Sequence, residues 1–179
     1  NKIKNKLNIL ISFGAYDTKN ITGKLISEIL KKKELYNSKF KFTIVLGKQA
    51  PNIQSIKRCI SKYEFINLRI QPKNFKNIIL KSDFAIGAPG VSQIERMYLG
   101  LPTILIPQNK IQETIILNLK KNKLSLNINH NIKCVSKNII NINRDELYLI
   151  KSNCLKLIDG KGSKRIAKII EKYMVKNAN

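Results

Sequence analysis

Short apolar runs alternate with longer amphipathic segments along most of the chain. Leu7–Phe13 and Phe40–Leu46 are nearly continuous apolar runs followed by a glycine, a pattern typical of buried strands in a parallel sheet. Three further short runs and one weaker run have the same character. The predicted strands are Leu7–Phe13, Phe40–Leu46, Asn67–Ile70, Phe84–Ile86, Thr103–Ile106 and, as a sixth, Ser125–Asn129.

The segments between these strands carry apolar residues at helical spacing. In the first of them, Leu25, Ile26 and Ile29 share one helical face, and Asp17 and Asn20 stand where they can cap the helix. Strands and helices that alternate through short connections predict an α/β fold, a doubly wound, Rossmann-like parallel sheet with helices on both faces. The predicted helices are Ile21–Leu30, Ile53–Tyr63, Asn74–Leu80, Val91–Leu99, Ile111–Lys120, Arg144–Leu157 and Ser163–Met174.

The length of the chain and its polar start bear on domain organisation. The 179 residues suit one domain, which is predicted to span residues 7–179. Residues 1–6 are polar, and we expect them to be a linker from an N-terminal domain of a longer protein. They lack the apolar segment of a signal peptide, and the chain has no apolar run long enough to cross a membrane. A cytoplasmic location is therefore expected.

The chain is strongly basic, with a formal net charge of +23. Its lysines are spread among asparagines and isoleucines, and no nucleic-acid motif or aromatic-basic platform accompanies them. A nucleic-acid partner is therefore not expected, although a basic module for nucleic acid or an anionic surface stays as the lowest-ranked alternative. In either case a positive field favours anionic ligands such as diphosphates.

Few side chains suit metal binding or nucleophilic chemistry. The three cysteines, Cys59, Cys134 and Cys154, are far apart and are not spaced like metal ligands, so reduced thiols are expected. The one histidine, His130, lies in a polar stretch and is predicted to be a solvated loop residue. We expect neither a metal nor a cofactor.

Two glycine-bearing turns follow predicted strands, FGAYD at residues 13–17 and GAPGVS at residues 87–92. In open α/β sheets, ligands bind beyond the carboxyl ends of the strands, and glycine lets the backbone approach a phosphate closely. The helix after the second turn would aim free N–H groups at the same place. Gly90, Val91 and Ser92 are therefore predicted to hold a diphosphate mainly through the backbone. The alternative is that both glycines serve only their turns.

Glu95 follows the second turn by one turn of helix, within a segment that is otherwise apolar or small. A carboxylate there can accept hydrogen bonds from both vicinal hydroxyls of a ribose. The alternative is a surface glutamate that pairs with Arg96 or with a nearby lysine.

Residues 82–103, SDFAIGAPGVSQIERMYLGLPT, resemble the signature of the C-terminal nucleotide-binding domain of glycosyltransferase-B-type proteins. They are most similar to the pseudaminic acid pathway UDP-sugar hydrolase and to the spore coat polysaccharide biosynthesis proteins. ILISFGAYDTKN at residues 9–20 and IDGKGSKR at residues 158–165 resemble two other segments of that family. The resemblance thus runs nearly from end to end.

The resemblance implies a role for each part of the predicted site, with UDP or a UDP-sugar as the ligand. It places Gly14 and Gly87 near the diphosphate and Glu95 at the ribose, and it agrees with a phosphate site at Gly90, Val91 and Ser92. It places uracil near Ile70 and Phe75, and the sugar near Asp17 and Gln112.

The function implied is hydrolysis of a UDP-linked diacetamido-trideoxyhexose to free sugar and UDP, in the biosynthesis of a pseudaminic-type nonulosonic acid or a surface polysaccharide. The catalytic residue of the family lies in an N-terminal domain, so this chain is expected to bind with little or no turnover. The alternative is the donor-binding half of a UDP-N-acetylglucosamine glycosyltransferase, in which case peripheral membrane contact is expected.

Some positions depart from the family pattern or leave two interpretations open. Ala15, Val91 and Ile111 stand where the family has Gly, Ser and Asn, which leaves the identity of the sugar open. Residues 159–162, DGKG, are predicted to form a turn that caps the last helix, with closure over the cleft as the alternative.

Overall fold

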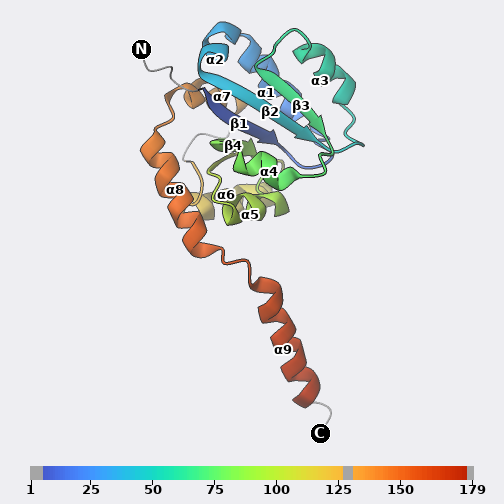
Figure 1. Ribbon diagram of the computed structural model, residues 1–179, viewed down its shortest axis with the longest axis vertical. Coiled ribbons are helices and arrows are strands. Elements are labelled where there is room, and N and C mark those ends of the chain that lie inside the picture. Colours follow the sequence, from blue (N-terminus) through green and yellow to red (C-terminus); the bar gives the residue numbers. More distant parts are fainter. Residues whose placement is uncertain (1–5, 127–130, 177–179) are drawn as a thin grey trace.

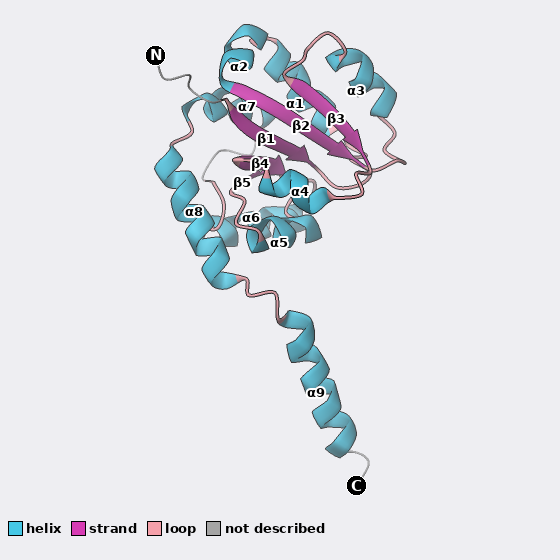
Figure 2. Ribbon diagram, viewed as in Figure 1, coloured by secondary structure: helices cyan, strands magenta, loops and turns pink. Residues whose placement is uncertain are grey.

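A five-stranded parallel sheet forms the centre of the molecule, with the strand order β3-β2-β1-β4-β5. The computed structural model describes residues 6–126 and 131–176. The order places β1 in the middle, between β2 and β4, and helices cover the sheet on both sides (Figures 1 and 2). The doubly wound α/β prediction is confirmed. The strands are β1 (Leu7–Ser12), β2 (Phe40–Leu46), β3 (Ile66–Ile70), β4 (Phe84–Gly87) and β5 (Thr103–Leu105).

Each predicted helix is present, with ends that differ from the predictions by at most a few residues. Two short helices, α2 and α7, and one 3-10 turn, η1, were not predicted. The helices are α1 (Ile21–Leu30), α2 (Lys33–Lys39), α3 (Ile53–Ile60), α4 (Phe75–Leu80), α5 (Val91–Tyr98), α6 (Lys110–Lys121), α7 (Ile132–Asn138), η1 (Ile139–Asn141), α8 (Arg144–Leu157) and α9 (Gly162–Lys176).

The strands are apolar on both faces because each face is buried under helices. Ile9 and Ile11 belong to a large cluster that includes residues of α1, α3 and α7. Leu10 lies between them in sequence and faces the opposite way, into a smaller cluster with Ile79 of α4. Continuous apolar runs, rather than alternating ones, are the sequence pattern that such a two-sided sheet requires.

The helix α2 is held by one aromatic side chain. Tyr36 is buried, contacts the rings of Phe40 and Phe42, and donates its hydroxyl to the carbonyl of Ser136 in α7. This bond joins two segments that are 100 residues apart. The two helices that were not predicted therefore support each other.

The sixth strand was predicted wrongly in the part that the structure describes. Ser125 and Leu126 are not in a strand, and residues 127–129 lie outside the described residues, as does His130. Leu126 donates its N–H to the carbonyl of Thr103, the first residue of β5, at 3.0 Å. The chain therefore approaches the edge of the sheet at β5.

The end of the chain forms two helices of different character. The helix α8 packs beside α5, whereas α9 runs away from the domain (Figure 1) and exposes apolar side chains such as Ile166 and Ile169. Asp159 accepts the N–H of Lys161 at 2.9 Å and pairs with Arg165 at 2.7 Å, and these interactions lower the pKa of Asp159 to about 2. A bend thus precedes the last helix, and Asp159 is bonded to the first turn of that helix through Arg165. Among the described residues, no helix is both long enough and apolar enough to cross a membrane.

Gly100 ends α5 in the left-handed region at φ +67°, and a Cβ there would lie 3.0–3.1 Å from side-chain atoms of Leu155 and Lys151 in α8. We predict that Gly100→Ala lowers the free energy of unfolding by about 1–2 kcal/mol, because alanine is strained at positive φ and must also push aside the side chains of Leu155 and Lys151.

Chemical denaturation measures this change. Gly162→Ala is the matched control, because that glycine starts α9 with open space around it and the substitution should leave stability unchanged or slightly raised. Equal stability of the two variants would contradict the role given to Gly100.

Candidate functional site

The strand order reverses direction at β1 and β4, and this point defines the candidate site. The two strands are paired in parallel, with Ser12, the last residue of β1, opposite Gly87, the last residue of β4. The loops that leave these two residues therefore start side by side at the carboxyl edge of the sheet. In doubly wound sheets this crevice is where ligands bind.

The turn after β4 presents open backbone at the start of α5. A Cβ on Gly90 would have no atom within 4 Å, so the backbone there is accessible to a ligand. Val91 is 80% exposed, and Ser92 is half-buried with its Oγ accepting from Arg96 at 3.4 Å. The first N–H groups of α5 lack helical partners and carry the positive end of its dipole. This end of α5 is chemically suited to an anion.

The loop after β1 faces the same crevice. Gly14 is exposed with φ +93°, and a Cβ added there would have no atom within 4 Å. Beneath it Asp17 is buried, and its carboxylate accepts the N–H groups of Ile21 and Thr22 at 2.9 Å each. The prediction that Asp17 and Asn20 cap this helix is confirmed. The structure thus uses Asp17 to fix the loop around Gly14.

The loop after β5 is tied to the loop after β1 by Gln108 and Lys19. Gln108 donates its Nε2 to the carbonyl of Phe13 at 2.8 Å, and Lys19 donates to the carbonyl of Gln108. Gln112, at the start of α6, accepts the N–H of Gln108 at 2.7 Å. Gln112 thus supports the loop after β5, and its predicted place near the sugar stays a prediction. Gln108 was missed, although its place just past β5 at the carboxyl edge was a usable signal.

Glu95 and Phe75 line one hollow of about 240 Å³ beside α5. Glu95 is exposed there, and Phe75 is half-buried at the start of α4. Ile70 ends β3 and does not belong to this hollow. In the described part of the chain, the ion pairs are Lys31–Glu28 and Arg165–Asp159, so the predicted alternative of a pair between Glu95 and Arg96 is not observed.

Arg96 is the residue of this region that sequence reasoning missed. Its side chain is fully buried behind the turn after β4 and donates to the carbonyl of Ala88 at 2.8 Å and to Oε1 of Gln93 at 3.1 Å. Burial lowers the pKa of Arg96 to about 10, so the guanidinium remains charged at neutral pH. A missed signal was the spacing of Gln93, Arg96 and Met97, which places all three on one buried helical face.

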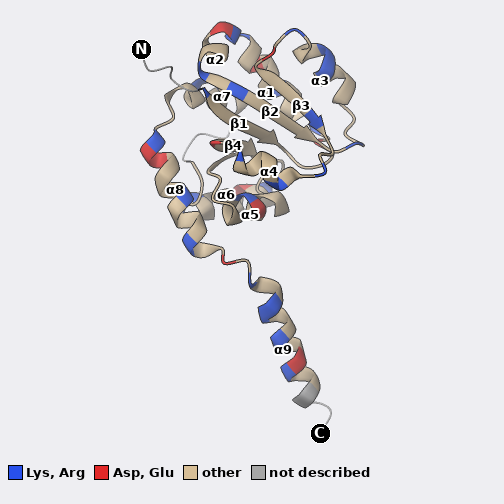
Figure 3. Ribbon diagram, in the orientation of Figure 1, with Lys and Arg blue, Asp and Glu red and all other residues tan. Residues whose placement is uncertain are grey.

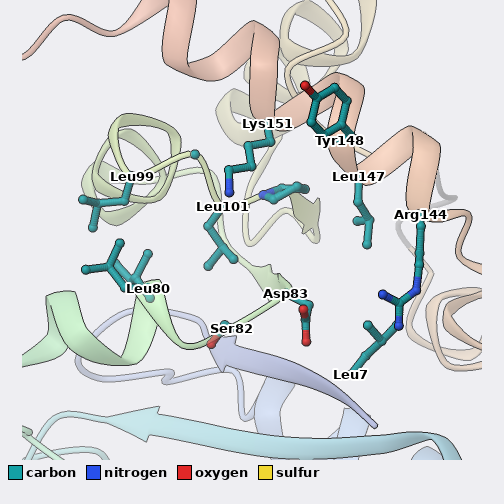
Figure 4. Close-up of a pocket in the computed structure, with 13 residues that line it drawn as sticks. Leu7, Leu80, Ser82, Asp83, Leu99, Leu101, Arg144, Leu147, Tyr148 and Lys151 are labelled. Carbon is teal, nitrogen blue, oxygen red and sulfur yellow. The ribbon is translucent and has the colours of Figure 1, made fainter. Parts of the chain in front are cut away.

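A different hollow, of about 360 Å³, lies at the opposite edge of the sheet (Figure 4). It is lined by residues at the amino ends of the strands, such as Leu7 and Asp83, and by Arg144 and Lys151 of α8. Asp83 is engaged there, accepting the N–H of Asn8 at 2.6 Å. Because ligands of doubly wound sheets bind at the carboxyl edge, this hollow is not the candidate nucleotide site.

The groups near the carboxyl edge are backbone N–H groups, hydroxyl and amide side chains, and the exposed carboxylates of Glu95 on α5 and Glu113 in the first turn of α6. Among the described residues, no three His, Cys, Asp or Glu side chains come together in a way that could hold a metal ion. The arrangement is suited to binding an anionic, hydroxyl-bearing ligand.

The two glycines of the second turn make a test of this geometry. A Cβ on Gly87 would lie 2.4 Å from the carbonyl oxygen of Ser12 and 3.0 Å from Nη1 of Arg96. We predict that Gly87→Ala lowers the free energy of unfolding by about 1–3 kcal/mol, because the closely packed turn must be displaced.

Gly90→Ala is the matched control, since its backbone φ of −111° suits any residue and its Cβ position is open. Thermal and denaturant unfolding should therefore separate the two variants. A Gly87→Ala protein as stable as Gly90→Ala would show that the turn is not packed as described.

Comparisons with known proteins agree with this fold and with part of the sequence resemblance. No protein-family model matches the chain. It is 30% identical over 114 residues to "Uncharacterized protein MJ1062" of Methanocaldococcus jannaschii, covering 62% of this chain and 23% of that protein. It is 25% identical over 101 residues to "Spore coat polysaccharide biosynthesis protein SpsG" of Bacillus subtilis, covering 56% of this chain and 29% of that protein. The chain thus spans about a quarter of the length of these relatives.

Solved structures of UDP-sugar enzymes share the architecture. The UDP-GlcNAc 2-epimerase of Neisseria meningitidis, bound to UDP-GlcNAc, superposes with a TM-score of 0.69 at 20% identity, covering 94% of this chain and 45% of that one. The pneumococcal O-GlcNAc transferase GtfA, in complex with UDP and GlcNAc, superposes with a TM-score of 0.58 at 14% identity, covering 95% of this chain and 35% of that one. The chain has the Rossmann-like α/β fold of the glycosyltransferase-B type that these neighbours contain.

Proposed function

We propose that this chain is the UDP-sugar-binding half of a two-domain enzyme of sugar-nucleotide metabolism. The observation that carries the proposal is the pairing of two open glycine turns at the β1–β4 crevice, with an exposed carboxylate one helical turn beyond the second. The similar structures with bound UDP or UDP-sugar support this class of ligand. The part of those chains that matches this fold is less than half of their length.

The diphosphate lies between the two turns in this proposal. Gly90, Val91 and Ser92 donate backbone N–H groups to it, and the loop of Gly14 closes the other side. These are backbone interactions, so the departure of Val91 from the family pattern costs a hydroxyl and leaves the phosphate site in place. A helix N-terminus and a glycine turn are the combination that binds phosphates in many unrelated proteins.

The nucleoside lies along α5. Glu95 is five residues from Gly90, roughly 7 Å along the helix axis at about 1.5 Å per residue. The two ribose hydroxyls donate hydrogen bonds to its carboxylate, and the half-buried ring of Phe75 in the same hollow contacts the uracil. Gln112 and the loop above Asp17 face the sugar.

The reaction that we propose is hydrolysis of a UDP-linked diacetamido-trideoxyhexose to free sugar and UDP. Its support is the resemblance of residues 82–103 to the hydrolase family, together with the spore coat polysaccharide relative. The exposed carboxylate of Glu95 is assigned to the ribose. The resemblance assigns the group that activates water to a part of the protein outside this chain, and we expect the chain alone to bind without turnover.

Transfer of N-acetylglucosamine from UDP is the second candidate function. It is favoured by the likeness to the structure of an O-GlcNAc transferase. The full-length protein distinguishes the two candidates: hydrolysis releases UDP and free sugar with water alone, whereas a transferase releases UDP only when an acceptor is supplied.

Calorimetric titration with UDP, UMP, CMP and GDP tests the proposed binding site. We predict a preference for UDP, and a loss of about tenfold to a hundredfold in UDP affinity in Glu95→Gln, because hydrogen bonds to a charged group contribute about 1.5–3 kcal/mol each. Glu64→Gln is the matched control, an exposed glutamate before β3 at the far edge of the sheet.

Two results would contradict the proposal. One is equal affinity for all four nucleotides, and the other is an unchanged UDP affinity in a folded Glu95→Gln variant. Binding that is abolished by modest salt and indifferent to Glu95 would instead indicate a nonspecific basic surface.

A further inference from the structure

Arg96 is a buried cation that forms no ion pair in the part of the chain that the structure describes, and the neighbouring carboxylate of Glu95 offsets only part of the effect of its burial. The side chain is fully buried, and the ion pairs of the described residues lie on α1 and at the start of α9. Burying a charge is costly unless an opposite charge or hydrogen bonds compensate it. Neutral oxygens of Ala88, Gln93 and Ser92 accept from Arg96, and none of them carries a negative charge.

The guanidinium lies directly behind the turn that we assign to the diphosphate. It contacts the carbonyl of Ala88 within the turn and the hydroxyl of Ser92 in the first turn of α5. It also fills the space beside Gly87, where a Cβ would be 3.0 Å from Nη1 and 3.1 Å from Nη2. The buried side-chain amide of Gln93 also lacks a hydrogen-bond partner at its Nε2.

The contact with Ala88 has a specific consequence for an anion. The peptide unit between Ala88 and Pro89 has no N–H, so the one polar atom it can offer is the carbonyl oxygen, which repels phosphate. Nη2 of Arg96 binds that oxygen at 2.8 Å from the buried side. A carbonyl oxygen that is bonded to a cation repels a nearby phosphate less than a free carbonyl oxygen does.

We infer that Arg96 is a positioning residue for the diphosphate. Its positive charge attracts the bound phosphates, and their negative charge compensates the buried guanidinium. The inference rests on the proposed UDP site and deepens it. The planar guanidinium donates in several directions at once and so bridges Ala88, Gln93 and Ser92. A lysine in its place supplies the charge without that geometry. The buried charge acts through protein rather than water, so it is screened less than the surface lysines are.

The test compares the affinities of UDP, UMP and uridine for the wild-type chain, Arg96→Gln and Arg96→Lys. We expect Arg96→Gln to lose at least about tenfold in UDP affinity while uridine affinity stays within about twofold, with UMP between them and Arg96→Lys recovering part of the loss. A residue that served only the fold would weaken all three ligands together. Arg58→Gln, an exposed arginine on α3, is the matched control for lost charge.

A measurement on the wild-type chain decides the question if the variants do not fold. The buried Nε–H of Arg96 should give a protected side-chain NMR signal, assigned through its contacts to Ala88 and Gln93. We expect the signal to shift on addition of UDP or inorganic pyrophosphate and to stay in place with uridine.

The possible failures are distinguishable. If the wild-type chain binds UDP no better than uridine, the proposed function falls and the inference falls with it. If the UDP preference persists in a folded Arg96→Gln variant, or if UDP and uridine shift the Nε–H signal equally, only the inference is overturned.

Discussion

The close contact between the ends of β1 and β4 is the constraint on which the rest of the site depends. Ser12 and Gly87 are paired across the sheet, and the carbonyl of Ser12 occupies the space that any side chain at position 87 would need. This contact sends the two following loops into the crevice side by side. Because Gly87 has no side chain, the guanidinium of Arg96 also fits beside it. Gly87 therefore permits both the close backbone contact and the buried charge next to the turn.

Different groups fix the shape of the loops and remain open to a ligand. The buried side chain of Asp17 and the half-buried one of Gln108 hold the loops by hydrogen bonds to backbone groups, and they keep the glycines accessible. The open positions at the crevice are backbone, at Gly14 and Gly90, whereas Glu95 lines the hollow beside α4. A backbone site tolerates substitution at positions such as Val91, whereas the supporting side chains do not have that freedom. In the proposed UDP-sugar site, specificity for the sugar is therefore expected from side chains farther from the diphosphate.

How much the sequence could predict depended on where the stabilising contacts lie. The strands and most helices were predictable because each carries its own apolar pattern, and Asp17 and Asn20 marked a helix start locally. The helix α2 has one buried residue, Tyr36, and exists through a bond to Ser136 a hundred residues away, which no local pattern encodes. The burial of Arg96 was not predictable for a different reason. Arginine beside glutamate suggests a surface pair, and only the three-dimensional packing shows that Arg96 is buried while Glu95 is exposed.

The distribution of charge explains why one arginine matters in a chain of net charge +23. Lysines and arginines occur on helices and strands around the whole molecule (Figure 3), and exposed charges are screened within about 8–10 Å at physiological ionic strength. Such a field attracts anions without selecting a place for them. Arg96 lies behind a turn whose outer face is open at Gly90, so its field is directed to one point. In the proposed site, the general charge acts on the approach of an anionic ligand, and the buried charge acts on where its phosphates bind.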